Sequence, residues 1–172
     1  MNKNNFLPYL AAVVLGGGLL FFLGNGTGRT SISSETPPSN QLNASTLSAS
    51  ESMFDFGTVS MSAGKVTHAF KIKNTSTTPV TITKIQTSCM CTVASLVTTT
   101  SRKGPFGMPG HVAIPKINEI IAPNQEAIIE AVFDPAAHGP AGVGKIRRIV
   151  YVEMNGNESN PLELSFEATV TP

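Results

Sequence analysis

The chain has 172 residues, of which 41% are hydrophobic and 13% are charged, and its formal net charge is +1. This length suits one domain with short appendages, because domains most often have about 100–150 residues. The basic residues are scattered along the chain, which argues against nucleic-acid binding, since a nucleic-acid surface gathers them into a patch. With no tryptophan and only 6% aromatic residues, a platform that stacks bases is also disfavoured.

The N-terminal segment is the most hydrophobic part of the chain. Residues 6–23 read FLPYLAAVVLGGGLLFFL, without a charge, and Lys3 precedes them. As a helix this segment would span roughly 27 Å, close to the hydrocarbon thickness of a bilayer. The positive N-terminus favours the inside of the cell, which places the rest of the chain outside the cytoplasm. We predict that residues 1–26 form a single-pass membrane anchor. The alternative is a signal peptide cleaved near Gly24 or Gly26, which would make the domain secreted.

Residues 27–52 are dominated by serine, threonine, asparagine and glutamine, and they contain Pro37 and Pro38. Such a segment buries too little apolar surface to offset the entropy lost on ordering. We therefore predict a flexible linker over this range. The folded domain is expected to occupy residues 53–172.

Alternation of apolar and polar residues begins beyond the linker and predicts strands with one buried face. The clearest strand-like segments are 65–73, 80–85, 127–133, 145–154 and 162–170. In the first segment His68 lies on the apolar face, where we expect a satisfied core or edge histidine rather than a ligand. In the second, Ile85 breaks the parity that Val80 and Ile82 set, which predicts a bulge or a change of sheet near Lys84.

Two segments lack this alternation and are rich in glycine and proline, residues 97–114 and 135–144. Both are predicted to be loops, and the first is long enough to suggest either function or mobility. No segment beyond the N-terminal region has a helical period. About seven short strands separated by turns predict an all-β fold, an immunoglobulin-like antiparallel β-sandwich.

Several short motifs follow one another along this domain. They are FDFGTV at 54–59, FKIKNT at 70–75, PVTI at 79–82, SCMCT at 88–92, IAPNQ at 121–125 and FD at 133–134. In this order they resemble the bacterial domain of unknown function 1573, a relative of the hydin-like immunoglobulin folds. The resemblance implies an immunoglobulin-like sandwich, common in envelope proteins, without an established catalytic activity.

The chain departs from the usual pattern of this family at two positions. Met90 stands where glycine is usual between the cysteines, and Asn124 stands where glycine often follows the proline. Asparagine tolerates the left-handed conformation, so we expect this turn to be retained.

Cys89 and Cys91 are the only cysteines of the chain. On a regular strand they would point to the same face, with Cα atoms about 6.6 Å apart, at the upper edge of disulfide geometry. A disulfide between them would be strained and therefore easily reduced. Alternatively, two thiolates can bind a soft ion such as Cu(I), with Met108, His111 or His138 as a third ligand. The simpler alternative is that both reduced cysteines pack in the sandwich. These three uses stay open.

A hydrolase needs a nucleophile, a base and an orienting acid. Asp134 and His138 are available, but no serine lies in a nucleophile turn, so we do not expect an enzyme. We predict a membrane-anchored, extracytoplasmic module with a binding or scaffolding role in the cell envelope, without a cofactor. It would bind a protein partner through a strand edge or its loops. The alternative is a thiol-redox or Cu(I)-binding protein that uses the Cys-Met-Cys motif.

Overall fold

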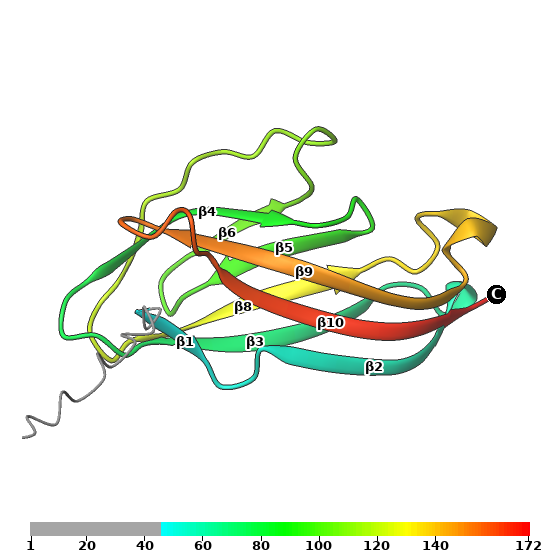
Figure 1. The fold of residues 1–172 in the computed structure, drawn as a ribbon, viewed down its shortest axis with the longest axis horizontal. Coiled ribbons are helices and arrows are strands. Elements are labelled where there is room, and N and C mark those ends of the chain that lie inside the picture. The colour runs from blue at the N-terminus through cyan, green and yellow to red at the C-terminus, as the bar shows by residue number, and fades with distance from the viewer. Residues whose placement is uncertain (1–45) are drawn as a thin grey trace, which may run out of the picture. The chain divides into compact units, whose positions relative to one another are not determined.

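The computed structural model describes residues 46–172, and these residues form an all-β fold (Figure 1). This confirms the predicted all-β class, although the described residues form ten strands where about seven were expected. The strands are β1 (Leu47–Ala49), β2 (Met53–Ser60), β3 (Val66–Asn74), β4 (Val80–Thr87), β5 (Thr92–Val97), β6 (Arg102–Phe106), β7 (Glu119–Ile121), β8 (Glu126–Phe133), β9 (Gly144–Met154) and β10 (Leu162–Thr171). Two short 3₁₀ helices lie between strands, η1 (Met61–Ala63) and η2 (Gly139–Gly142).

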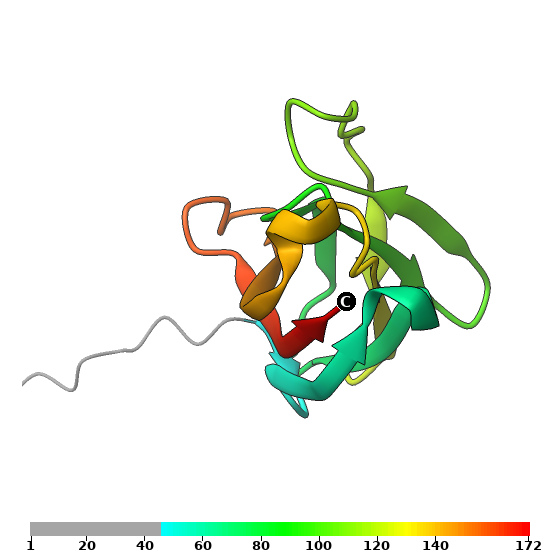
Figure 2. The same ribbon diagram turned by 90° about the vertical axis from the view of Figure 1, so that its right-hand side faces the viewer.

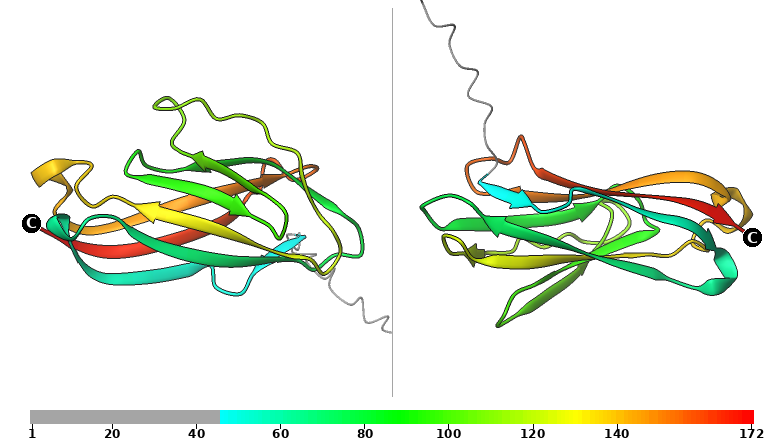
Figure 3. Two further views of the ribbon diagram at one scale, coloured as in Figure 1. Left: turned by 180° about the vertical axis from the view of Figure 1, so that it is seen from behind. Right: turned by 90° about the horizontal axis from the view of Figure 1, so that it is seen from below.

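The strands form two five-stranded sheets that stack as layers (Figure 3). The first sheet has the order β1-β3-β8-β5-β6, and the second has the order β2-β10-β9-β4-β7. Neighbouring strands are antiparallel, with the exception of β2 and β10, which are parallel. The prediction of a wholly antiparallel sandwich is therefore corrected at this one edge. There β2 follows a short crossing at residues 50–52 from the first sheet, and it runs in the same direction as β10.

Apolar side chains from both sheets fill the space between the layers. Phe133 of β8 and Phe166 of β10 meet across the two sheets with ring centroids 5.4 Å apart. At the β2–β3 side, the ring of Phe54 stacks on His68 at 3.7 Å. The Nε2 atom of His68 lies 3.1 Å from a carboxylate oxygen of Glu51. His68 is therefore a satisfied histidine at the edge of the core, as its position on the apolar face predicted.

The parity break in β4 is a bulge. Ile82 and Ile85 are both fully buried, although residues three apart on a regular strand point to opposite faces. The register of β4 against β9 shifts between Ile82 and Lys84, and the extra residue returns Ile85 to the inner face. The predicted bulge near Lys84 is confirmed.

The turns beside β4 and β8 depend on two asparagines. The buried side-chain amide of Asn74 donates to the carbonyl oxygens of Thr78 and Ile121, at 2.9 Å each. It thereby fixes the turn that leads through Pro79 into β4. Asn124 has a φ of 63°, so the turn before β8 retains the left-handed conformation expected for asparagine at this position.

The segment 97–114, predicted to be a loop, contains strand β6, which pairs with β5 at the edge of the first sheet. The prediction was wrong here because Gly104 and Pro105 interrupt the strand pattern. An edge strand tolerates proline, since one of its sides needs no N–H donor. An ion pair between Arg102 and Glu130 of β8 also holds this strand. The segment 135–144 contains only the short helix η2 before β9 begins.

Strand β1 lies inside the range predicted as the linker. It pairs antiparallel with β3, and Leu47 is fully buried, so the ordered domain begins before residue 53. The predicted anchor at residues 1–26 lies outside the described residues. Among residues 46–172, no helix is long and apolar enough to span a membrane.

Candidate functional site

Both cysteines lie in the turn at residues 88–91, which carries the chain from β4 in one sheet to β5 in the other. The hydroxyl of Thr87 donates to the carbonyl oxygens of Cys89 (3.0 Å) and Thr92 (2.9 Å). The N–H of Thr92 also donates to the Cys89 carbonyl oxygen at 3.1 Å. The assumption that the cysteines lie on a regular strand was wrong, because these hydrogen bonds fold the segment into a turn.

Both sheets hold this turn in place. The N–H of Ser88 donates to the Ile149 carbonyl oxygen (2.9 Å), and the N–H of Ile149 donates to the Ser88 hydroxyl (2.9 Å). On the other side, the N–H of Asp134 donates to the Cys91 carbonyl oxygen at 2.8 Å. The turn is thus fixed to β9 in one sheet and to the end of β8 in the other.

His138 reaches the turn from the segment that follows β8. A carboxylate oxygen of Asp134 accepts the N–H of Ala136 (3.0 Å), which turns the chain directly after the strand. The N–H of Gly139 then donates to the Ala136 carbonyl oxygen (2.9 Å). A side chain at Gly142 would bring its Cβ atom within 3.2 Å of the His138 Cβ atom, so glycine leaves room for the histidine. Figure 2 faces the end of the sandwich where η2 and the C-terminus lie.

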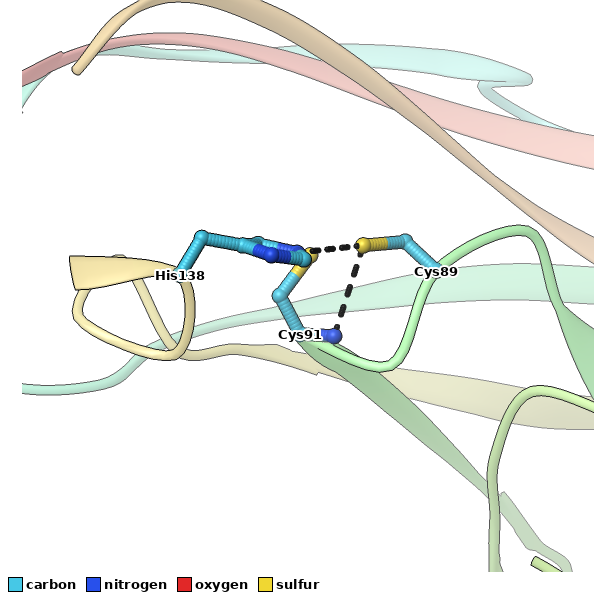
Figure 4. A group of neighbouring side chains, drawn as sticks. All are labelled: Cys89, Cys91 and His138. Atoms are coloured by element: carbon cyan, nitrogen blue, oxygen red, sulfur yellow. Dashed lines mark hydrogen bonds between the residues drawn. The ribbon is translucent and has the colours of Figure 1, made fainter. Parts of the chain in front are cut away.

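The three side chains point toward one another (Figure 4). The Cys89 Sγ atom lies 3.1 Å from His138 Nε2 and accepts the Cys91 backbone N–H at 3.4 Å. The sulfur atoms of Cys89 and Cys91 and a ring nitrogen of His138 all lie within 4.8 Å of one another. Cys91 is buried, Cys89 is half-buried and His138 is exposed, and both thiols are free. We call Cys89, Cys91 and His138 the thiol cluster.

A cation lies against the thiol cluster. Arg148 of β9 donates through Nε to the Cys91 Sγ atom at 3.2 Å, and its Nη1 atom donates to the Arg147 carbonyl oxygen at 2.9 Å. A neighbouring arginine favours the thiolate form of a cysteine, which is the form that acts as nucleophile and metal ligand.

The two thiols differ in acidity. Partial burial raises the pKa of Cys89, but hydrogen bonds from Cys91 and His138, with the charge of Arg148, more than offset this effect. The pKa of Cys89 is lowered to about 7. Burial raises the pKa of Cys91, and the hydrogen bond with Cys89 raises it further, although Arg148 acts in the opposite direction. The first proton therefore leaves Cys89, the more accessible of the two thiols.

The structure brings together only part of the predicted set. His138 joins the two cysteines, whereas His111 is not in the cluster. Met108 begins the same long loop as His111, and its carbonyl oxygen accepts the His111 N–H at 3.2 Å. Arg148 was missed as a site residue, because nothing beside it in the sequence links it to the cysteines. It is 57 positions from Cys91, and His138 is 49 positions from Cys89. Only knowledge that β5 pairs with β8 and that β4 pairs with β9 could have shown that His138 and Arg148 lie near the cysteines.

The fold and this cluster define a β-sandwich that carries a dithiol–histidine site at one end. Residues 47–108 match the family described as "Protein of unknown function (DUF1573)", and the relationship predicted from the motifs is confirmed over this range. The matched range includes both cysteines, while His138 and Arg148 lie beyond it. No curated protein matches the sequence of the chain.

Three solved structures are similar to this chain at low sequence identity. A protein of unknown function from Porphyromonas gingivalis W83 is 14% identical with a TM-score of 0.51, and the match covers 72% of this chain and 46% of that one. The secreted serine protease VesC from Vibrio cholerae is 11% identical with a TM-score of 0.48, covering 76% and 25%. The PapD-like domain 7 of human CEP192 is 13% identical with a TM-score of 0.42, covering 73% and 85%. The first match shows a shared fold, and this chain spans less than half of that protein.

Proposed function

We propose that this chain is a non-catalytic binding or scaffolding module of immunoglobulin-like type, held outside the cytoplasm of a bacterial cell by its N-terminal segment. The observation that carries the proposal is the architecture of the domain. Two five-stranded sheets enclose an interior filled with apolar side chains, so recognition is left to the strand edges and the end loops. Sandwiches commonly recognise partners through such surfaces.

The edges of the second sheet supply the contact surface. Within residues 46–172, β2 and β7 each pair with a strand on one side only. Each carries an exposed apolar side chain, Met53 at 53% and Ile120 at 61% exposure. A partner protein can add an extended segment to a free edge, where main-chain hydrogen bonds give affinity and side-chain contacts give specificity.

The sequence of the N-terminal region supports the location. The uncharged residues 6–23, preceded by Lys3, have the length and flanking charge of a membrane anchor that leaves the following chain outside. The polar residues that follow this segment, predicted to be a linker, would tether the sandwich to the membrane.

Site-specific photo-crosslinking in the native bacterium tests this proposal. A photoreactive residue is placed at Met53 or Ile120 of the full chain, with Glu167 as the matched control, an exposed residue of β10 that is paired with β2 on one side and β9 on the other. We expect a defined protein adduct from at least one edge position and none from Glu167. The absence of an adduct at both edge positions, in cells that contain the variants at normal levels, would contradict the proposal.

A further inference from the structure

The thiol cluster has the composition and spacing of a metal site. Its two sulfur atoms and one imidazole nitrogen come from two separate connections, the β4–β5 turn and the segment after β8. Bonds of about 2.0–2.3 Å from thiolate and imidazole ligands to one ion place the donor atoms about 3.5–4 Å apart. The three donors already lie within 4.8 Å of one another, and Cys89 Sγ is 3.1 Å from His138 Nε2. Small side-chain rotations therefore suffice to surround one ion.

We propose that Cys89, Cys91 and His138 bind one Cu(I) ion, through both thiolate sulfur atoms and the Nε2 atom of the imidazole. This inference goes beyond the proposed binding of a protein partner, and it gives the module a second, inorganic ligand. Thiolates are soft ligands that select Cu(I) over hard divalent ions.

The charge beside the cluster distinguishes a monovalent ion from a divalent one. Two thiolates and Cu(I) carry a net charge of −1, and the Arg148 guanidinium, 3.2 Å from Cys91 Sγ, brings the total to zero. With Zn(II) the same ligands would be neutral, and half-buried Arg148 would have no net negative charge to compensate it. Opposite charges at this distance attract, whereas a neutral site gives the guanidinium no such gain. The arginine therefore favours Cu(I).

The number of ligands argues against a structural Zn(II) site, which has four protein ligands in nearly all cases. A three-ligand Zn(II) site with an open position has the same ligand count as Cu(I) here, and the charge of Arg148 is what separates the two ions. Among residues 46–172, the cysteine, histidine and acidic side chains supply a cluster of three. The tight turn at 88–91 and the hydrogen bond from Asp134 hold the two sulfur donors before any ion arrives, so metal binding does not have to order the backbone.

Anaerobic competition titration of the reduced full chain in detergent tests the site. Cu(I) is supplied as its coloured bicinchoninate complex, and loss of colour reports transfer to the protein. We expect one Cu(I) per chain, and a loss of affinity of at least about tenfold in His138→Ala, since even an outer partner of a metal ligand is worth 10–100-fold. Cys89→Ser should lose more, because a thiolate ligand is removed. The matched control His111→Ala, an exposed histidine outside the cluster, should bind as the unchanged chain does.

Several outcomes would overturn the proposal. In one such outcome, Cu(I) stays with bicinchoninate while both cysteines of the chain react as free thiols. Another is an equal loss of affinity in His111→Ala and His138→Ala. A parallel titration with Zn(II) that shows tighter binding than Cu(I) would reject the assignment of the ion. Recovery of a Cys89–Cys91 disulfide that forms reversibly and excludes Cu(I) would favour a redox pair instead.

Cys91 is buried, so Cys91→Ser can disturb the fold. The test therefore relies on Cys89 and His138 variants whose circular dichroism matches that of the unchanged chain.

Discussion

Two histidines of this domain occupy opposite chemical environments. His68 stacks on Phe54 at 3.7 Å, meets the edge of Phe70 at 4.5 Å and bonds to Glu51. His138 is exposed, and its Nε2 atom lies 3.1 Å from the Cys89 sulfur. The first imidazole completes a packed aromatic group, while the second completes a set of soft ligands. The comparison teaches that the role of a histidine follows from its neighbours. Substitution of His68 should therefore change the stability of the domain, and substitution of His138 should change its affinity for Cu(I).

The largest effect is expected in the aromatic group that surrounds His68. Phe166 is fully buried and contacts Phe56 and Phe133 at centroid distances of 5.3 and 5.4 Å. Phe166→Ala should lower the free energy of unfolding by about 3–5 kcal/mol, because a large cavity forms between the sheets. Chemical denaturation measures this change. A loss below 1 kcal/mol would mean that the two sheets do not pack through this ring.

The two histidine variants should differ in what they lose. His68→Ala removes the stacked ring and the contact with Glu51, and we expect a loss of about 1–2 kcal/mol in the free energy of unfolding with unchanged Cu(I) affinity. His138→Ala should stay within about 0.5 kcal/mol of the parent in stability, while its Cu(I) affinity falls. Denaturation and copper titration on both variants measure the four quantities. If His68→Ala weakened Cu(I) binding as strongly as His138→Ala, the separation of roles would be wrong.

The acidity of Cys89 gives a pH-dependent prediction for the metal-free chain. Because the thiolate is the reactive form and the pKa of Cys89 is about 7, its alkylation rate should rise with pH, reach half its maximum near pH 7 and level off above that value. Cys91 should react only at higher pH, since burial raises its pKa. In His138→Ala the Cys89 midpoint should move upward, because a hydrogen bond that lowers the pKa is lost. Mass spectrometry of each peptide measures both rates, and a midpoint near 9 for Cys89 in the unchanged chain would show that its neighbours do not act on it.

The smallest effect concerns the space beside His138. Gly142→Ala would place a Cβ atom within 3.2 Å of the His138 Cβ atom, so the imidazole must shift by a few tenths of an ångström. We expect a severalfold loss of Cu(I) affinity or less, with an unchanged far-ultraviolet spectrum, because ligand position affects a metal site at this scale. The control is Val143→Ala, which shortens an exposed side chain in the same segment without adding an atom beside His138. A larger loss in this control than in Gly142→Ala would contradict the explanation.

Strands with a repeating pattern could be predicted from the sequence, while contacts between distant segments could not. The alternation in β3 and β10 and the parity break at Ile85 are local, so they indicated the strands and the bulge near Lys84. Strand β6 was missed because Gly104 and Pro105 hide an edge strand whose pairing depends on β5. Strand β1 was missed because a three-residue strand in a polar segment leaves little pattern, although Leu47 is fully buried. A protein fragment that begins at residue 53 would lack this strand.

The candidate site shows the same limit. The sequence left three uses open for Cys89 and Cys91, a disulfide, a metal site or packing. Their geometry was predicted from a regular strand, and the hydroxyl of Thr87 holds them in a turn instead. Nothing near His138 in the sequence distinguishes it from His111, since both lie in loops rich in glycine and proline. Only the packing of η2 beside the β4–β5 turn separates the ligand from the unrelated histidine.

X-ray absorption at the copper edge of the Cu(I)-loaded full chain tests the central claim most directly. The number of sulfur and nitrogen neighbours of the ion depends on its ligands alone, whatever the stability of the domain. We predict two sulfur atoms and one imidazole nitrogen per copper in the unchanged chain, and loss of the imidazole signal in His138→Ala. A first coordination shell with fewer than two sulfur atoms, or an imidazole signal that persists in His138→Ala, would contradict the account.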